Sequence, residues 1–441
     1  MNTSNLFIYI PSNNIPEREY VMDFIFHEFL GVDYILSEDK DLECTKICFN
    51  NKQILIKDAL WAVFPQPLGY MHIENLPLPS RGWNKYCIEN DIVILYGENK
   101  VTNDGNSIFC GIDIFASIFY MLTRWEEYVI KNRDAHDRFP ANRSIAFKYD
   151  FLHRPIVNEY IEMLWNMMED FGVPIQRRKR YFQIVPTHDI DNYRIPNRIW
   201  TISEEILKNI YHKRLFNFAA YLKAFLSDPY DTIEFLMDTS EAAGLKSHFY
   251  LMSADARIDK QTSSRWIYKN RFLREVKRIL ERGHIVGFHP GYFTYRSQEH
   301  FHNEKDLLKQ ALDIQVDEGR QHFLMTRIPE TMRIWNEEGM LVDSTLSYAD
   351  AEGFRCGTGD EFYYFDFLQR KKLQLRERPL ILMDGTLLNY RKYSLAESEQ
   401  KIKKYFEIGK KYQMPITILF HNSIFFGRKG LKEMYKRVLT I

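Results

Sequence analysis

The sequence is poor in cysteine, with five cysteines in 441 residues. Their number is odd, their positions are scattered, and no two of them form a CxxC pair. They are Cys44, Cys48, Cys87, Cys110 and Cys356. A disulfide framework needs paired cysteines and a thiolate zinc site needs closely spaced ones, so this distribution argues against both kinds of site.

The sequence also has no net charge, because 59 basic residues balance 59 acidic ones. This balance gives no reason to expect a nucleic-acid partner or an anionic membrane surface. The chain has no basic N-terminal region followed by a long apolar one, and no apolar run is long enough to cross a bilayer. We therefore expect a cytoplasmic protein that binds no nucleic acid and is not stably inserted in a membrane. The sequence predicts no oligomeric state.

The composition is that of a globular protein, with 45% apolar and 27% charged residues, and the length exceeds that of one average domain. We predict two domains, residues 1–178 and 179–441, both of the α/β class. The boundary follows from the charged run at 176–180, which carries no core residues. Before it, short apolar runs and helical spacing at 113–128 and 156–171 predict a smaller accessory domain.

Strand and helix patterns alternate after residue 181, which is typical of an α/β architecture with largely parallel strands. The predicted helices span about 232–243, 271–282, 303–318, 330–338 and 397–412. The predicted strands span 181–186, 246–252, 284–289, 320–325, 380–383 and 416–420. In such sheets and barrels the chemistry collects at the carboxyl ends of the strands. Five candidate residues fall at such ends: Asp189, Asp191, His289, Asp384 and His421.

The segment Thr187–Asp191 places an imidazole and two carboxylates at the end of the first of these strands. Side chains alternate along an extended chain, so Asp189 and Asp191 should project to the same side and His188 away from them. One carboxylate could then bind a metal ion while the other takes a proton.

These residues resemble the motifs of the polysaccharide deacetylases, the NodB-homology, family 4-like carbohydrate esterases, whose fold is a distorted (β/α) barrel. Thr187–Asp191 resembles the first motif and Gly283–His289 the second. Arg320–His322 resembles the third motif and Leu419–Ser423 the fifth. The resemblance covers residues 181 to 425 in order and spacing. Residues 1–180 resemble an uncharacterised domain that precedes this deacetylase type in some bacterial proteins, at 124–128, 138–140 and 151–157.

The resemblance implies a role for each matched residue. Asp189 would be the general base, and Asp191 and His289 would bind a divalent metal ion. Arg320 would steady the base, and His421 would be the general acid. We further expect Asp384 to support the proton on His421, since a carboxylate partner raises the pKa of an imidazole.

One departure from the family leaves the metal site short of a ligand. The family usually has a second histidine four residues after the first, where this chain has Phe293. We expect His322 to replace it, because it lies two residues after Arg320 on the same face of the predicted strand. His188 should point away, and His300 and His302 lie in a polar stretch before a predicted helix.

We therefore expect a metal-dependent hydrolase, most simply a zinc enzyme, that removes an acetyl or similar acyl group from an amino sugar, polysaccharide or glycan precursor. Aromatic and polar residues suited to sugar binding are Tyr292, Tyr348, Asp350 and Arg355. One alternative is a non-catalytic carbohydrate-binding barrel that has lost the second metal-binding histidine. Another is a two-histidine, one-carboxylate iron site for oxygen chemistry, in which His421 would have no obvious role.

Overall fold

The computed structural model describes residues 6–49, 51–194, 198–211, 227–253 and 270–440. The chain divides into two compact units, and each is described separately. The first comprises residues 1–180, 327–333 and 353–379, and the second comprises 181–326, 334–352 and 380–441. The predicted boundary at residue 178 stays a prediction. Within the described residues, no helix is both long and apolar enough to cross a membrane.

The first unit is built on a six-stranded mixed sheet in the order β2-β1-β3-β4-β8-β7. Its strands are β1 (Leu6–Pro11), β2 (Tyr34–Asp39), β3 (Cys44–Phe49), β4 (Lys52–Lys57), β7 (Gly97–Asn103) and β8 (Ser107–Ile112). A hairpin of β5 (Ser80–Gly82) and β6 (Ile92–Ile94) and a second one of β14 (Phe362–Asp366) and β15 (Lys371–Glu377) complete its strands. Its helices include α1 (Ile15–Met22), α2 (Ile114–Thr123), α3 (Glu126–Val129), α4 (Ile145–Lys148) and α5 (Ile156–Asp170). The apolar runs expected to form strands and helices in this half of the chain do so, except that the helix predicted at 113–128 is divided into α2 and α3 at Arg124, whose φ is 53°.

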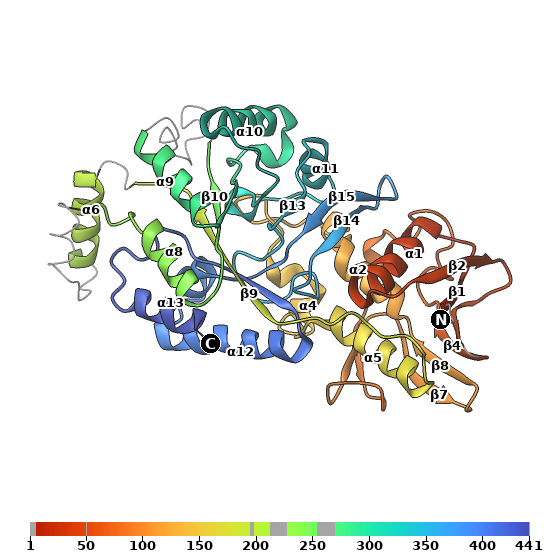
Figure 1. Ribbon diagram of the computed structural model, residues 1–441. Helices are drawn as coiled ribbons and strands as arrows, with labels where there is room; N and C mark the ends of the chain where they lie inside the picture. The colour runs from red at the N-terminus through yellow and green to blue at the C-terminus, as the bar shows by residue number, and fades with distance from the viewer. Residues whose placement is uncertain (1–5, 50, 195–197, 212–226, 254–269, 441) are drawn as a thin grey trace. The chain divides into compact units, whose positions relative to one another are not determined.

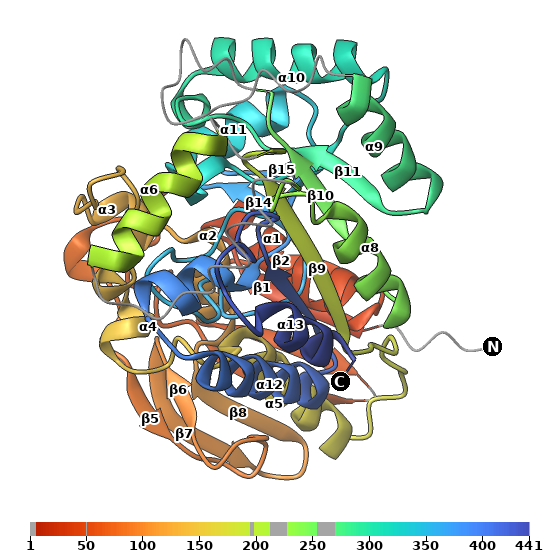
Figure 2. The ribbon, with the colours of Figure 1, turned by 90° about the vertical axis from the view of Figure 1, so that its left-hand side faces the viewer.

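The second unit contains parallel strands in the order β13-β12-β11-β10-β9-β17-β16, and this sheet curls into a half-barrel (Figures 1 and 2). The strands are β9 (Gln183–Ile190), β10 (His248–Leu251), β11 (Ile285–Phe288), β12 (Glu318–Gly319), β13 (Val342–Asp343), β16 (Leu380–Met383) and β17 (Pro415–Leu419). All but β13 are fully or largely buried, as strands in the interior of a parallel sheet are expected to be.

The helices of the second unit alternate with these strands, and most agree with the sequence pattern. They are α6 (Arg198–Tyr211), α8 (Ile233–Ala242), α9 (Asn270–Glu281), α10 (Gln298–Leu312), α12 (Leu395–Tyr412) and α13 (Leu431–Leu439), while α11 (Glu330–Glu337) includes residues of both units. Ser394 and Glu397 form a capping box that fixes the start of α12. The predicted strands around residues 250, 287, 382 and 418 are confirmed within two residues at either end.

Two predicted elements are wrong. The helix predicted at 303–318 lies at Gln298–Leu312, because the Ser297 side chain accepts a hydrogen bond from the His300 backbone N–H and caps its start, and the chain leaves the helix at Asp313, whose φ is 52°. His300 and His302 therefore lie within α10 and not before it, and His302 pairs with Glu338.

The predicted strand 320–325 is the second error, because β12 ends at Gly319. A Cβ atom at Gly319 would lie 2.0 Å from the Phe288 carbonyl oxygen, so only glycine allows β12 to run this close to β11. The chain then turns into a short 3-10 helix at His322–Leu324. Phe323 and Leu324 have φ angles of 58° and 55°, which no strand can contain.

Candidate active site

The candidate residues lie just beyond the carboxyl ends of neighbouring parallel strands. Asp191 directly follows β9, and His289 directly follows β11. Asp384 directly follows β16, and His421 comes two residues after β17. Because these strands are parallel, their carboxyl ends meet at one edge of the sheet. His322 reaches the same place from the turn after β12.

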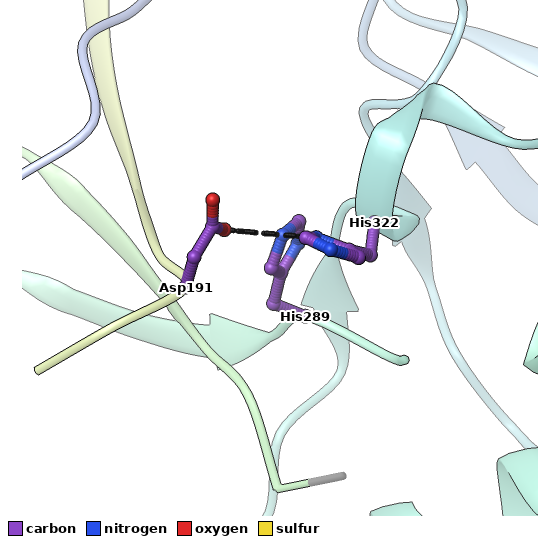
Figure 3. A group of neighbouring side chains, drawn as sticks. All are labelled: Asp191, His289 and His322. Carbon is purple, nitrogen blue, oxygen red and sulfur yellow. Dashed lines mark hydrogen bonds and ion pairs between the residues drawn. The ribbon is translucent and has the colours of Figure 1, made fainter. Parts of the chain in front are cut away.

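Asp191, His289 and His322 form a compact triangle of ligand atoms (Figure 3). His289 Nε2 lies 3.1 Å from Asp191 Oδ1 and 3.1 Å from His322 Nδ1, and His322 Nδ1 lies 3.6 Å from Asp191 Oδ1. In a tetrahedral zinc site with bonds of about 2.0–2.2 Å, the ligand atoms are about 3.3–3.6 Å apart. The spacings of 3.1, 3.1 and 3.6 Å lie in this range or about 0.2 Å below it, so the three atoms are close to the positions of three ligands of one such ion.

The tautomer of His289 supports this fit. Its Nδ1 lies 2.6 Å from the Arg320 carbonyl oxygen, and a carbonyl can only accept, so Nδ1 carries the proton. When the ring is neutral, Nε2 presents its lone pair to the Asp191 carboxylate, and a cation between them would be bound by both groups. A backbone carbonyl that holds the second nitrogen of a histidine ligand in this way is a usual feature of metal sites.

The electrostatics of the triangle favour the metal-binding protonation states of Asp191 and His322. Burial raises the pKa of Asp191, but its hydrogen bond to His289 and the charges of the surrounding histidines outweigh burial and hold the pKa below its usual range. Burial lowers the pKa of His322 to about 3. Burial also lowers the pKa of His289, but the charges of Asp189 and Asp191 raise it above its ordinary value, so a proton and a metal ion would compete for its lone pair.

Asp189 lies beside this triangle and is held by Arg320, and both side chains are buried. Arg320 Nη1 donates to Asp189 Oδ1 at 2.8 Å and to Thr187 Oγ1 at 2.9 Å. Its Nε and Nη2 donate to the carbonyl and hydroxyl oxygens of Ser344, at 2.7 and 2.9 Å. The second carboxylate oxygen, Asp189 Oδ2, lies 3.9 Å from His289 Nε2. One oxygen of Asp189 is therefore fixed, and the other faces the triangle.

His421 lies on the other side of Asp191 and is paired with the buried Asp384. Its Nδ1 donates to Asp384 Oδ1 at 2.8 Å, and its backbone N–H donates to Asp384 Oδ2 at 2.7 Å. Its Nε2 lies 3.9 Å from Asp191 Oδ2. Burial lowers the pKa of His421, but the charges of Asp384 and Asp191 raise it to about 10. The imidazole is therefore protonated at neutral pH.

The structure thus brings together all seven residues expected to do chemistry or bind metal. His188 points away from them, as the alternation along the strand predicts, and its ring bonds to the Phe420 carbonyl and Ser247. Sequence reasoning missed Ser344, which follows a two-residue strand and offers no signal of its own, as a partner of Arg320. Thr187 is also a partner of Arg320, and its place inside the first motif is a sequence signal that could have identified it.

The expected substrate-binding residues are more dispersed. Tyr292 packs edge-to-face against Phe293 and Phe323, and Phe323 in turn packs against His322. Tyr348 is buried and Asp350 is half-buried. Arg355 is buried in the first unit, where its Nε donates to Glu127 at 2.9 Å. This ion pair satisfies the guanidinium group within the first unit, so the structure gives Arg355 a structural partner.

Comparisons with known proteins cover the chain only in part. The profile of a family of unknown function, DUF7033, matches residues 6–172, which is less than half of the chain. No curated protein matches.

Three solved structures are similar to part of the chain. One is assigned as a polysaccharide deacetylase of Mycobacterium smegmatis, with 12% identity, 59% of this chain and 84% of that chain covered, and a TM-score of 0.40. Another is a mutant CE4 family pseudoenzyme with restored enzymatic activity, with 11% identity, 60% and 62% covered, and a TM-score of 0.32. The third is a family 4 carbohydrate esterase from Streptomyces lividans in complex with acetate, with 9% identity, 59% and 86% covered, and a TM-score of 0.30. Similarity at this level does not assign a function to the chain.

Proposed function

We propose that the second unit is a metal-dependent hydrolase, a distorted barrel of the NodB type, that removes an acetyl or similar acyl group from an amino sugar, a polysaccharide or a glycan precursor. The observation that carries this proposal is the convergence of a ligand triangle, a buried carboxylate and a protonated imidazole at one edge of the sheet. A hydrolase of this kind needs a Lewis acid, a base and an acid around one carbonyl carbon.

Asp191, His289 and His322 would hold the metal ion. Zinc is the simplest choice, because two imidazoles and one carboxylate are a common zinc ligand set that leaves a position for water. When bound, such an ion polarises the substrate carbonyl and lowers the pKa of water from about 15.7 to about 7. The same ligand set would also suit iron, but oxygen chemistry at an iron site would have no role for the protonated His421.

Asp189 would take the proton of the attacking water. Its Oδ1 accepts a hydrogen bond from Arg320, which holds the carboxylate in place, and its Oδ2 faces the ligand triangle. A base at this place can receive a proton from a water that attacks the acyl carbon beside the metal ligands. General base catalysis of this kind contributes about 100- to 10,000-fold to a rate.

His421 would protonate the leaving group. Asp384 accepts the hydrogen bond from Nδ1, so the Nε2 proton of the imidazolium is directed toward the candidate site. The nitrogen of an amide or the alkoxide of a sugar ester is a poor leaving group unless it is protonated as the bond breaks. The raised pKa of His421 means that this proton is present at the pH at which the base must be ionised.

Acetate release tests the proposal. Purified protein loaded with zinc is assayed against acetylated amino sugars and their oligomers, and a chelator-treated sample and an Asp189→Asn variant serve as controls. We expect release that depends on both the metal and Asp189. A protein that holds no metal but still binds glycan would instead be the carbohydrate-binding barrel, and stoichiometric metal with no release from any acetylated sugar would contradict the proposal.

A further inference from the structure

The peptide unit between Phe420 and His421 is held from both sides. Its carbonyl oxygen lies 2.8 Å from His188 Nδ1, and its N–H donates to Asp384 Oδ2 at 2.7 Å. Because a peptide unit is planar, two hydrogen bonds at its opposite edges fix the orientation of the plane. The Cα atom of His421 belongs to this plane, so these bonds also fix the origin of the His421 side chain.

The direction of the His188 hydrogen bond follows from its partner. A carbonyl oxygen only accepts, so Nδ1 of His188 donates. Burial lowers the pKa of His188 to about 3, so the ring is neutral and holds a single proton, the one on Nδ1. Nε2 must then accept, and two hydroxyl groups are in reach: Ser247 Oγ at 3.1 Å and Tyr435 OH at 3.3 Å. Ser240 in turn bonds to Ser247 Oγ at 2.6 Å.

The same strand end makes further bonds to this segment. The Thr187 carbonyl accepts from the Phe420 backbone N–H at 3.1 Å, and Thr187 Oγ1 donates to the Ile418 carbonyl at 2.8 Å. The end of β9, which carries Asp189, is therefore bonded directly to the segment that carries His421. His188 itself is fully buried and directed away from the ligand triangle, so it cannot touch a substrate.

We propose that His188 is a positioning residue that fixes the place of His421 relative to Asp189. It does so by a hydrogen bond to the Phe420–His421 peptide, here called the clamp, on the side opposite the bond to Asp384. This inference rests on the proposed function for the role of His421 as an acid. An imidazole is suited to this place because one nitrogen donates to the peptide while the other accepts from the hydroxyl groups behind it. A phenylalanine at the same position would fill the space but leave the Phe420 carbonyl without its donor.

Two substitutions of His188 separate the effect of its hydrogen bond to Phe420 from the effect of its packing in the interior. In His188→Asn the side-chain NH2 can take the place of Nδ1–H and still donate to Phe420. In His188→Gln the polar end takes the place of Nε2, so the donor to Phe420 is lost while the contact with Ser247 is kept. Tyr435→Phe is a matched control, because it removes a partner of Nε2 and leaves the donor in place.

The readout is the ratio of kcat for a poor leaving group to kcat for a good one. An N-acetyl amino sugar needs His421 to protonate the amine, whereas 4-nitrophenyl acetate releases a stable phenolate without help. We expect His188→Gln to lower this ratio by about 10- to 100-fold, since small misplacement of a catalytic group has effects of this size. His188→Asn and Tyr435→Phe should keep the wild-type ratio. An unchanged ratio in His188→Gln would overturn the inference.

Amide hydrogen exchange in the metal-free protein tests whether His188 holds the Phe420–His421 peptide, and this measurement does not depend on catalytic activity. The His421 amide should exchange about tenfold faster in His188→Gln than in His188→Asn, because one bond that holds the peptide is lost. An equal rate in the two variants would overturn the inference. If the wild-type protein hydrolyses neither substrate, the proposed function fails, and this exchange difference still decides whether His188 holds the peptide. If a variant does not fold, the ¹⁵N spectrum of wild-type protein labelled in histidine decides, since the inference requires the Nδ1–H tautomer at His188.

Discussion

Zinc should stabilise this protein strongly, and His322 should be responsible for most of that effect. His322 Nδ1 is one corner of the ligand triangle, 3.1 Å from His289 Nε2 and 3.6 Å from Asp191 Oδ1. Replacing it by glutamine removes an imidazole ligand and leaves two protein ligands. Loss of even a supporting partner of a ligand weakens metal binding by about 10- to 100-fold. For the ligand itself we expect a loss of about 100-fold or more.

The size of the effect follows from binding linkage. Free zinc at about 100 times the dissociation constant of the wild-type site adds about 2.7 kcal/mol to the free energy of unfolding. For a unit of roughly 150 to 250 residues, this corresponds to a rise in Tm of about 5–11 °C. At the same zinc concentration, a site that binds about 100-fold more weakly gains only about 0.4 kcal/mol, and its Tm should rise by about 1–2 °C.

The measurement is thermal unfolding with and without buffered zinc, followed by a probe of the second unit. His302→Gln is the matched control, since His302 is exposed on α10, is paired with Glu338 and lies outside the triangle. This control should keep the full rise in Tm. A His322→Gln protein that also keeps the full rise would refute the assignment of His322 as a ligand.

Three further predictions follow from the contacts of the site. Asp189→Asn should lower kcat for acetate release by about 100- to 10,000-fold without loss of bound zinc, and a parallel loss of metal in elemental analysis would contradict its role as the base. Arg320→Met should lower the free energy of unfolding by about 3–5 kcal/mol in urea titrations, because it leaves the buried Asp189 charge without its partner, and a loss below about 1 kcal/mol would contradict the importance of this pair. His188 should destabilise the fold in acid: its folded pKa of about 3 lies below the value of about 6.5 in the unfolded chain, so its contribution is complete above pH 6.5 and falls as the pH drops toward 3. By pH 5 this loss should be about 2 kcal/mol, and His188→Asn, which does not titrate, should lose correspondingly less stability between pH 7 and pH 5.

The segment that carries Asp189 and Asp191 shows what sequence periodicity can predict. The period of two along an extended chain places both carboxylates on one side and His188 on the other, and the structure has this arrangement. Apolar runs that end in His or Asp also predict correctly that Asp384 and His421 follow buried strands. That these ends meet at one edge follows from the parallel topology, which the alternation of strands and helices predicts.

The surroundings of His322 show what the sequence could not predict. The expectation that it lies near the metal site rested on a strand that does not exist, because β12 ends at Gly319. The turn that replaces it depends on contacts distant in sequence. Gln321 is fully buried, and its side chain donates to the Gly291 carbonyl and to Thr294 Oγ1, at 3.0 and 2.6 Å. Such contacts leave no periodic signal in the sequence.

These contacts also explain why the chain accepts unfavourable backbone angles beside the site. Left-handed φ angles at Phe323 and Leu324 cost about 1–3 kcal/mol each, and such residues persist only when their surroundings hold them. Arg320 and Gln321, which precede His322, are both buried and hydrogen-bond to β11 and to the loops that follow β11 and β13. The turn directs His322 back toward His289. His322 therefore offers a ligand atom, which the side chain of Phe293 does not have.

The exposure of the site residues indicates from which side a substrate would arrive. Asp189, Arg320, His289 and Asp384 are buried, whereas the side chains of Asp191 and His421 are 26% and 21% exposed. Asp191 turns Oδ1 toward the two histidines of the triangle and Oδ2 toward His421. An acyl carbonyl that enters over Asp191 would therefore meet the metal ligands on one side and the proton of His421 on the other. This order places the leaving group next to the only acid among the described site residues that can protonate it, and it leaves the buried Asp189 to receive the proton of the attacking water.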